Sequence, residues 1–177
     1  SVAFAVNDMT VDTSATGTSS ARAYVDGWLQ FTAFVPVNSE FGVFMYEDTA
    51  GTDYDSYWGQ GTVTTAGTGI TFTTRQFGFK RTRAASGPPV LSATNANGTS
   101  ETATARTNQT TGLYTARKTG TASIVFYRNN VLQATHTTNI PTAASFASLV
   151  TVAVSNVSVA TRTLVRFYNP QSTFSGE

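Results

Sequence analysis

The chain of 177 residues contains no cysteine and a single histidine, His136. The missing cysteines exclude a disulfide framework, thiolate metal sites and thiol nucleophiles, and one histidine excludes a metal site built from several imidazoles. Charged residues reach only 12%, against about 25% in an average protein. No apolar run approaches the roughly 18 residues that a membrane-spanning helix needs, so we expect no such helix and no membrane partner. Hydrophobic residues make up 40% of the chain, which predicts a folded core rather than disorder.

The length predicts one domain. We expect residues 1–177 to form it, with residues 1–20 acting as an N-terminal arm or as a strand exchanged between subunits. Residues 13–21, which are rich in Ser, Thr, Gly and Ala, would then link that strand flexibly to the body.

Threonine and serine together make up more than a quarter of the chain, and β-branched threonine favours strands over helices. No segment shows sustained helical spacing, whereas alternation of apolar and polar residues with period two recurs. We expect strands over residues 24–37, 41–47, 69–75, 76–83, 113–117, 123–128, 131–138, 149–154 and 161–168.

The clearest turn is Asn129-Asn130, which separates two β-rich runs. Asparagine tolerates the positive φ angles of a two-residue hairpin turn, so we predict a hairpin here. Many short strands without helices predict an all-β fold, namely a two-sheet antiparallel β-sandwich of jelly-roll type. An immunoglobulin-like sandwich is the alternative.

The stretch TGLYTARKTGTASIVFYRNNVLQATHTT, residues 111–138, resembles a segment of concanavalin A-like, laminin-G-like β-sandwich domains in bacteriophage structural and tail-associated proteins. The matching positions are Gly112, Tyr114, Arg117, Gly120 and Tyr127-Arg128-Asn129. Asn130 stands where that group usually has glycine. Residues 41–55 are similar to the strand and acidic loop that often precede this segment. The resemblance implies a concanavalin A-like sandwich and suggests a virion.

The charges are distributed unevenly along the chain. Residues 1–60 carry eight acidic residues and one basic residue, whereas the rest carry two acidic and ten basic ones. The fold could neutralise this polarity internally. Alternatively, each subunit has an acidic and a basic patch, which favours contacts between identical copies.

The densest basic stretch contains Arg75, Lys80, Arg81 and Arg83 beside two phenylalanines. Such a stretch can contact single-stranded nucleic acid or another subunit. Because the net charge is only +1 and the residues alternate, a solvated sheet face is the favoured interpretation, and we expect no nucleic-acid partner.

Four acidic residues, Glu47, Asp48, Asp53 and Asp55, lie close together in the sequence and are the best candidates for a calcium site. A solvated turn is the favoured alternative, and we expect no other cofactor. Tyr54, Tyr57 and Trp58, with Asp53 and Asp55, could bind a glycan by ring stacking and hydrogen bonds to hydroxyls. Packing of these rings in the core is the favoured alternative.

Glycosidases on sandwiches of this kind need two carboxylates close together, and the chain has no Glu-x-Asp-x-x-Glu pattern. We expect the only histidine, His136, on an exposed strand face. No strand-turn-helix arrangement for a serine nucleophile is present. We therefore expect that the protein is not an enzyme.

These observations predict a virion structural or surface-attached protein, such as a capsid decoration, fibre or tail component, in a virion or extracellular setting. It would form homo-oligomers, contact other virion proteins and could bind a host-surface glycan. One alternative is a lectin-like glycan-binding module. Another is a jelly-roll capsid coat protein, with Lys80, Arg81 and Arg83 facing nucleic acid.

Overall fold

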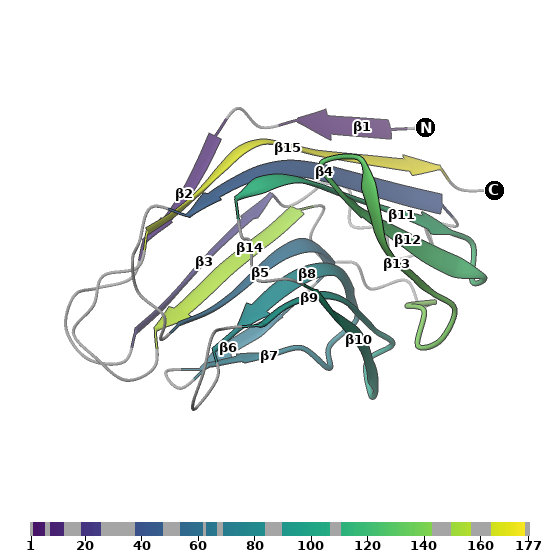
Figure 1. Ribbon diagram of the computed structural model, residues 1–177, viewed down its shortest axis with the longest axis horizontal. Coiled ribbons are helices and arrows are strands. Elements are labelled where there is room, and N and C mark those ends of the chain that lie inside the picture. Colours follow the sequence, from purple (N-terminus) through teal and green to yellow (C-terminus); the bar gives the residue numbers. More distant parts are fainter. Residues whose placement is uncertain are drawn as a thin grey trace.

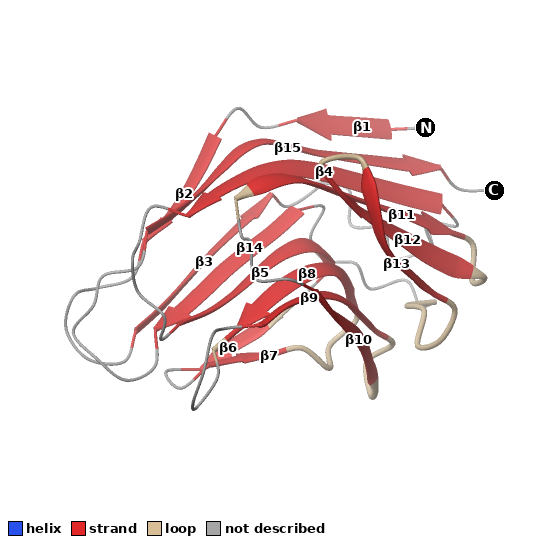
Figure 2. Ribbon diagram, viewed as in Figure 1, coloured by secondary structure: helices blue, strands red, loops and turns tan. Residues whose placement is uncertain are grey.

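The computed structural model describes residues 2–5, 8–12, 19–25, 38–47, 54–61, 63–66, 69–83, 90–106, 111–142, 150–156 and 164–175. Within these ranges, side chains are described from residue 38 to residue 142, except at 47, 54, 65 and 66. Every regular element in the described part is a β-strand (Figure 2). Among these residues there is accordingly no helix long and apolar enough to span a membrane.

Two antiparallel sheets lie face to face, and a small two-stranded sheet lies below them (Figure 1). The seven-stranded sheet has the order β1-β15-β4-β11-β12-β13, with β2 also paired to β15, and the six-stranded sheet has the order β10-β9-β8-β5-β14-β3. The strand bounds are β1 Val2–Ala5, β2 Asp8–Asp12, β3 Ser19–Val25, β4 Asn38–Glu47, β5 Tyr54–Gly61, β6 Thr64–Ala66, β7 Gly69–Thr71, β8 Gln76–Thr82, β9 Val90–Ala96, β10 Glu101–Arg106, β11 Gly112–Thr119, β12 Ser123–Arg128, β13 Val131–His136, β14 Val150–Asn156 and β15 Leu164–Ser175. The predicted all-β sandwich is confirmed.

Aromatic side chains from both sheets form the centre of the core. Trp58 of β5 stacks on Phe79 of β8, with ring centroids 6.3 Å apart. Tyr114 of β11 meets both rings edge-on from the opposite sheet, at 5.0 Å from Trp58 and 4.7 Å from Phe79. Tilted and edge-to-face pairs of this kind stabilise beyond the area that they bury. The cluster therefore joins the two layers.

A second apolar cluster lies on the outer face of the six-stranded sheet, under the β6–β7 hairpin. It consists of Tyr57, Val63, Ile70 and Phe72. Because the hairpin covers this face, β5 is buried on both faces from Asp55 to Gly61.

The β12–β13 hairpin confirms the predicted turn. Asn129 and Asn130 have φ angles of 48° and 63°, the positive values that a two-residue turn needs. The Asn129 side chain accepts a hydrogen bond from the Leu113 amide at 2.9 Å, which ties the turn to the start of β11.

Several predicted strands differ from the structure. Strands β2, β5, β6, β9 and β10 were not expected, and only residues 69–71 of the expected strand 69–75 are in a strand. Most of the expected strand 24–37 lies outside the described residues. In the N-terminal segment, β1 pairs with β15 of the same chain. A single domain, and exchange of this strand between subunits, stay predictions.

Candidate functional site

The alternation in β4 and β11 places one set of side chains in the core and the other on the outer face of the seven-stranded sheet. Phe41, Val43 and Met45 are buried, whereas Phe44 and Tyr46 are exposed. In β11, Tyr114 and its alternate neighbours are buried, and the residues between them face outward.

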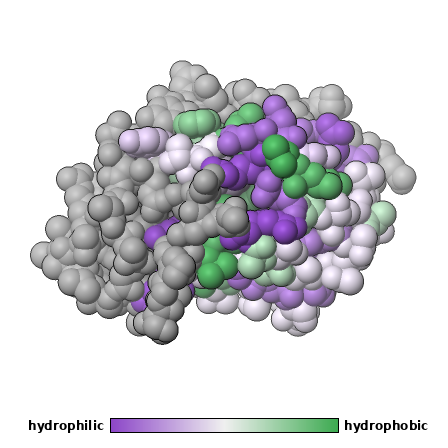
Figure 3. Space-filling view, in the orientation of Figure 1, coloured by the Kyte–Doolittle hydropathy of each residue, from purple (hydrophilic) through white to green (hydrophobic). Residues whose placement is uncertain are grey.

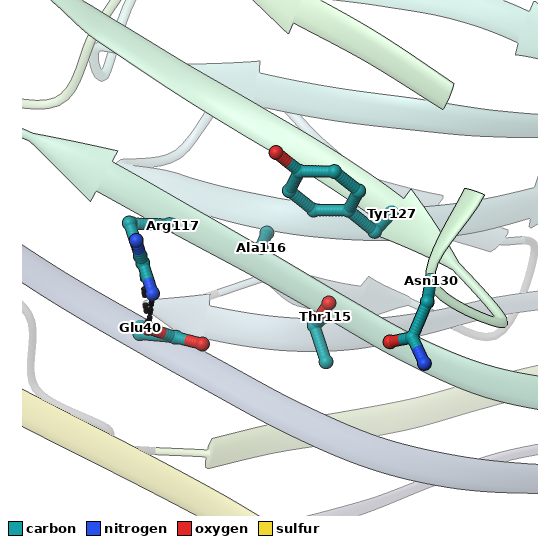
Figure 4. Close-up of a pocket in the computed structure, with 6 residues that line it drawn as sticks. All are labelled: Glu40, Thr115, Ala116, Arg117, Tyr127 and Asn130. Atoms are coloured by element: carbon teal, nitrogen blue, oxygen red, sulfur yellow. Dashed lines mark hydrogen bonds and ion pairs between the residues drawn. The ribbon is translucent and has the colours of Figure 1, made fainter. Parts of the chain in front are cut away.

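A pocket of about 280 Å³ lies on this outer face. It is lined by Glu40 of β4, Thr115, Ala116 and Arg117 of β11, Tyr127 of β12 and Asn130 of the turn. Figure 4 shows the Glu40–Arg117 pair on one side of Thr115 and Asn130 on the other, with the Tyr127 ring beside them. None of these residues belongs to a site predicted from the sequence.

Strand register creates the charged side of the pocket. Arg117 lies directly opposite Glu40 in the β4–β11 pairing. Its Nε and Nη2 atoms each lie 3.0 Å from Oε2 of Glu40. The two side chains are 66% and 41% exposed, so the pair adds at most about 1 kcal/mol to stability.

The pocket combines hydrogen-bonding groups of several kinds with one aromatic ring. Glu40 accepts, Arg117 donates, and the Thr115 hydroxyl and the Asn130 amide can do both. Tyr127 adds a ring that is partly exposed. A few convergent polar groups beside an aromatic surface are typical of small-ligand sites, and this set suits a ligand rich in hydroxyl groups.

Exposed apolar side chains lie around the pocket. Val131 and Leu132, the first two residues of β13 after the turn, are 63% and 57% exposed. Apolar atoms gather over the β12–β13 hairpin among hydrophilic ones (Figure 3). Phe44, Tyr46 and Leu113 are exposed on the same sheet. We call these five residues the apolar surface.

The structure corrects the predicted glycan site at two positions. Tyr57 and Trp58 are 0% exposed, so neither ring offers a face to a sugar. The Tyr57 hydroxyl donates to the carbonyls of Gln60 and Phe77, and burial raises its pKa well above its ordinary value. Both rings are core residues, which is the alternative that the sequence left open. The Tyr54 side chain lies outside the described residues.

Of the four residues of the predicted calcium site, only Asp55 has a side chain that the structure describes. Its carboxylate accepts a hydrogen bond from the Arg83 amide at 2.9 Å. Burial raises the pKa of Asp55, against the opposing effects of that amide and of the Arg83 and Arg81 charges. The Glu47 side chain, Asp48 and Asp53 lie outside the described residues. No group of three or more potential metal ligands occurs within the part that the structure covers, and calcium binding stays a prediction.

The predicted basic stretch does not form one basic surface. Lys80 and Arg81 neighbour each other on β8 and point to opposite faces of the sheet. Lys80 is largely buried in an ion pair with Glu101, and Arg81 is 2% exposed. Arg75 is exposed and Arg83 is partly exposed. Burial of Lys80 and Arg81 overturns the interpretation of these two residues as part of a solvated sheet face. Contact of this stretch with nucleic acid or another subunit stays a prediction.

His136 is buried rather than on an exposed strand face. Asn95 uses its amide nitrogen to donate to the carbonyls of Thr138 and Asn139, so its oxygen accepts from Nδ1 of His136. Nε2 of the neutral ring can then accept from the Thr104 hydroxyl at 2.8 Å. Burial, with a smaller contribution from the Arg106 charge, lowers the pKa of His136.

The acidic side chains that the structure describes, Glu40, Asp55 and Glu101, lie far apart. Glu101 is in register with Gly61, six residues along β5 from Asp55 and three strands away. Strand geometry puts the two more than about 20 Å apart, whereas glycosidases hold their carboxyl groups about 5–10 Å apart. Glu40 is on the other sheet. No pair of these three can act as the acid and nucleophile of a glycosidase.

No family model matches the chain, and no curated protein matches it in sequence. Solved structures do match it in fold. A legume lectin-like domain from Entamoeba histolytica has a TM-score of 0.56 and 9% identity, with 96% of this chain and 91% of that one covered. A β-1,3-glucanase from Mycobacterium marinum has a TM-score of 0.55 and 8% identity, with 94% and 74% covered.

A botulinum neurotoxin type C structure, described for its interaction with two ganglioside molecules, has a TM-score of 0.54 and 8% identity. The match covers 93% of this chain but only 38% of the neurotoxin chain. These three include a lectin-like domain, a toxin and an enzyme, and none is described as a bacteriophage protein, so a role in a virion stays a prediction. At such low identity the matches show fold alone, and the chain has the two-sheet β-sandwich fold of lectin-like, jelly-roll proteins.

Proposed function

We propose that this chain is a non-catalytic carbohydrate-binding module and that its site is the pocket between β4, β11 and β12. The observation that carries the proposal is the arrangement around Thr115: a carboxylate and a guanidinium on one side, an amide on the other and an aromatic ring beside them. Sugars offer hydroxyl groups that both donate and accept, together with C–H faces that pack on aromatic rings. The pocket provides a partner for each of these features.

The fold is shared with a lectin-like domain as well as with a glucanase, so it is compatible with binding and with catalysis. The composition of the pocket supports binding. Glu40 is the only carboxylate among the described residues that line the pocket. The other two described acids, Asp55 and Glu101, are on the opposite sheet. A single carboxylate already paired with arginine is suited to accepting hydrogen bonds from a ligand.

A module of this kind attaches the particle or molecule that carries it to a glycan-coated surface. We extend the proposal to an extracellular or virion setting, in which the sandwich is a surface-attached component. The resemblance of residues 111–138 to tail-associated phage domains supports this setting, and the pocket residues from Thr115 to Asn130 lie in that same segment.

A glycan array with the wild-type chain and two variants tests the proposal. Tyr127→Ala removes the ring, and we expect array signals to fall at least tenfold. Asn130→Gly removes the amide but retains a residue that favours the positive φ of this position. We expect weaker binding with unchanged or slightly higher stability. The proposal is wrong if the wild-type chain binds no glycan on the array.

A second candidate function is assembly into homo-oligomers, and the apolar surface favours it. Five exposed large hydrophobic residues on one sheet, of which Phe44, Tyr46 and Leu113 share the outer face, exceed the single exposed apolar residues that are ordinary on a monomer. The occupant would be a second copy of this chain.

Light scattering over a range of concentrations tests assembly. We expect the wild-type chain to associate and Leu132→Ser to weaken that association, because it replaces exposed apolar area with a hydroxyl. Association driven by the apolar surface persists in high salt, whereas association driven by acidic and basic patches declines. A monomer at every concentration and ionic strength contradicts this function.

A further inference from the structure

Of the described residues that line the pocket, only Arg117 is positively charged. A guanidinium binds carboxylates through two parallel hydrogen bonds, and for this reason arginine is common in sites for acidic ligands. Here the Nε and Nη2 edge already faces a carboxylate of the chain itself, with both nitrogens 3.0 Å from Oε2 of Glu40. The group best able to hold an acidic sugar is therefore occupied.

Strand pairing fixes the positions from which the two side chains meet. Glu40 and Arg117 are 77 residues apart in the sequence but directly opposite each other in the β4–β11 ladder. The backbone of Glu40 is also tied to the opposite sheet, since its carbonyl accepts a hydrogen bond from the Gln60 side chain of β5 at 3.2 Å. A ligand carboxylate thus competes with one that the fold keeps in place at high effective concentration.

We propose that Glu40 is a specificity-determining residue that restricts the pocket to uncharged sugars. This inference rests on the proposed function. An acidic sugar would have to displace Glu40 from the Nε and Nη2 edge and leave two carboxylates side by side, which like-charge repulsion disfavours. A neutral sugar with adjacent hydroxyl groups can donate to Oε1 of Glu40 and accept from another guanidinium nitrogen of Arg117 while the pair stays intact.

The exposure of the pair sets the expected size and the salt dependence of this selectivity. Both side chains are substantially exposed, so solvent and salt screen the repulsion. Selectivity should therefore be greatest at low ionic strength. The same exposure means that removing the charge of Glu40 leaves the fold intact.

Glu40→Gln tests the inference, with Asp12→Asn as the matched control because it removes one negative charge from β2 of the same sheet. Oligosaccharides of galactose, glucose and mannose are compared with the corresponding uronates, which differ only by a carboxylate at C6. Dissociation constants are measured by calorimetry at low and high salt, after denaturant unfolding shows that each variant is folded.

We expect the wild-type chain and Asp12→Asn to bind neutral oligosaccharides about fivefold more tightly than the uronates at low salt, as suits an exposed ion pair. Glu40→Gln should remove most of this ratio by gaining affinity for uronates, with neutral binding changed by less than about twofold, and high salt should shrink the gain. Equal binding of both classes by the wild-type chain, or an unchanged ratio in Glu40→Gln, overturns the inference and leaves the proposed function standing. Binding of neither class by either protein overturns the proposed function itself.

Discussion

His136 illustrates how a polar residue becomes part of a core. Its two ring nitrogens are matched by Asn95 on β9 and Thr104 on β10, so the neutral ring is fully hydrogen-bonded while it packs against Phe126 at 4.8 Å. The sequence shows only a histidine in a threonine-rich strand. Its partners are more than 30 residues away in the chain and cannot be predicted from local pattern.

The lowered pKa of His136 predicts a specific pH dependence of stability. Below its ordinary value of 6.5, the unfolded chain binds a proton that the folded chain resists, so the free energy of unfolding should fall as the pH drops below about 6.5. Above that range this residue contributes no pH dependence. The slope from one such group is at most about 1.4 kcal/mol per pH unit.

Urea unfolding between pH 5 and pH 8 measures this dependence in the wild-type chain and in His136→Gln. We expect the variant to lose less stability on acidification than the wild-type chain. The same slope in both proteins would show that His136 is not responsible.

Two glycines, Gly59 and Gly78, lie opposite each other in the pairing of the central strands β5 and β8. A Cβ at Gly59 would come within 2.6 Å of the Tyr57 hydroxyl, which donates to the carbonyls of Gln60 and Phe77. A Cβ at Gly78 would overlap the Trp58 carbonyl and approach the Cα of Gly59 to 2.7 Å. No side chain fits where Gly59 and Gly78 face each other.

Gly78→Ala should therefore lower the free energy of unfolding by about 1–3 kcal/mol through overpacking. Gly42→Ala on β4 is the matched control, because its Cβ would make only an ordinary 3.4 Å contact with Thr115. We expect no loss of stability in that variant, as alanine is at least as favourable as glycine in a strand. Chemical denaturation measures both variants. Equal losses in the free energy of unfolding would show that the close approach of β5 and β8 at Gly78 is not the cause.

The strands differ in how visible they are in the sequence, and burial explains the difference. Alternation identified β4, β11 and β12, where one face meets the core and the other meets solvent. Strands β5 and β9 are buried on both faces, so period two is lost from their sequences. Strand β10 is short and has no large apolar side chain, so it carries little signal in any case. The pattern thus identifies half-exposed strands most readily, although β8, which is largely covered, also lies within an expected range, residues 76–83.

The aromatic cluster around Trp58 joins the two layers. A variant of Trp58 distinguishes the two roles considered for it, core packing and glycan binding. Trp58→Ala should lower the free energy of unfolding by about 3–5 kcal/mol, because it opens a cavity between the sheets. This is a large share of the 5–15 kcal/mol that stabilises a typical domain. Thermal and denaturant unfolding measure the loss.

Glycan binding per folded molecule should stay unchanged in Trp58→Ala at low temperature, where the variant is folded. If Trp58→Ala lost glycan binding but kept normal stability, Trp58 would be a glycan-binding residue and not a core residue.

The described contacts bring together acids from the N-terminal third of the chain and bases from the remainder. Glu40 pairs with Arg117, and Asp55 lies close to Arg81 and Arg83. Part of the charge polarity in the sequence is therefore neutralised inside the fold, as the first of the two interpretations predicts.

The β-branched composition, the period-two alternation and the Asn129-Asn130 turn were enough to predict an all-β sandwich and one of its hairpins. These signals act between residues that are close in the chain, so they can be read without knowing the fold. The pocket depends instead on β4 and β11 being neighbours in one register, since a slip of one residue would turn Arg117 away from Glu40. That register follows from packing the two sheets around a common core, in which burial of Phe41, Tyr114 and their neighbours determines the side chains that meet on the opposite face.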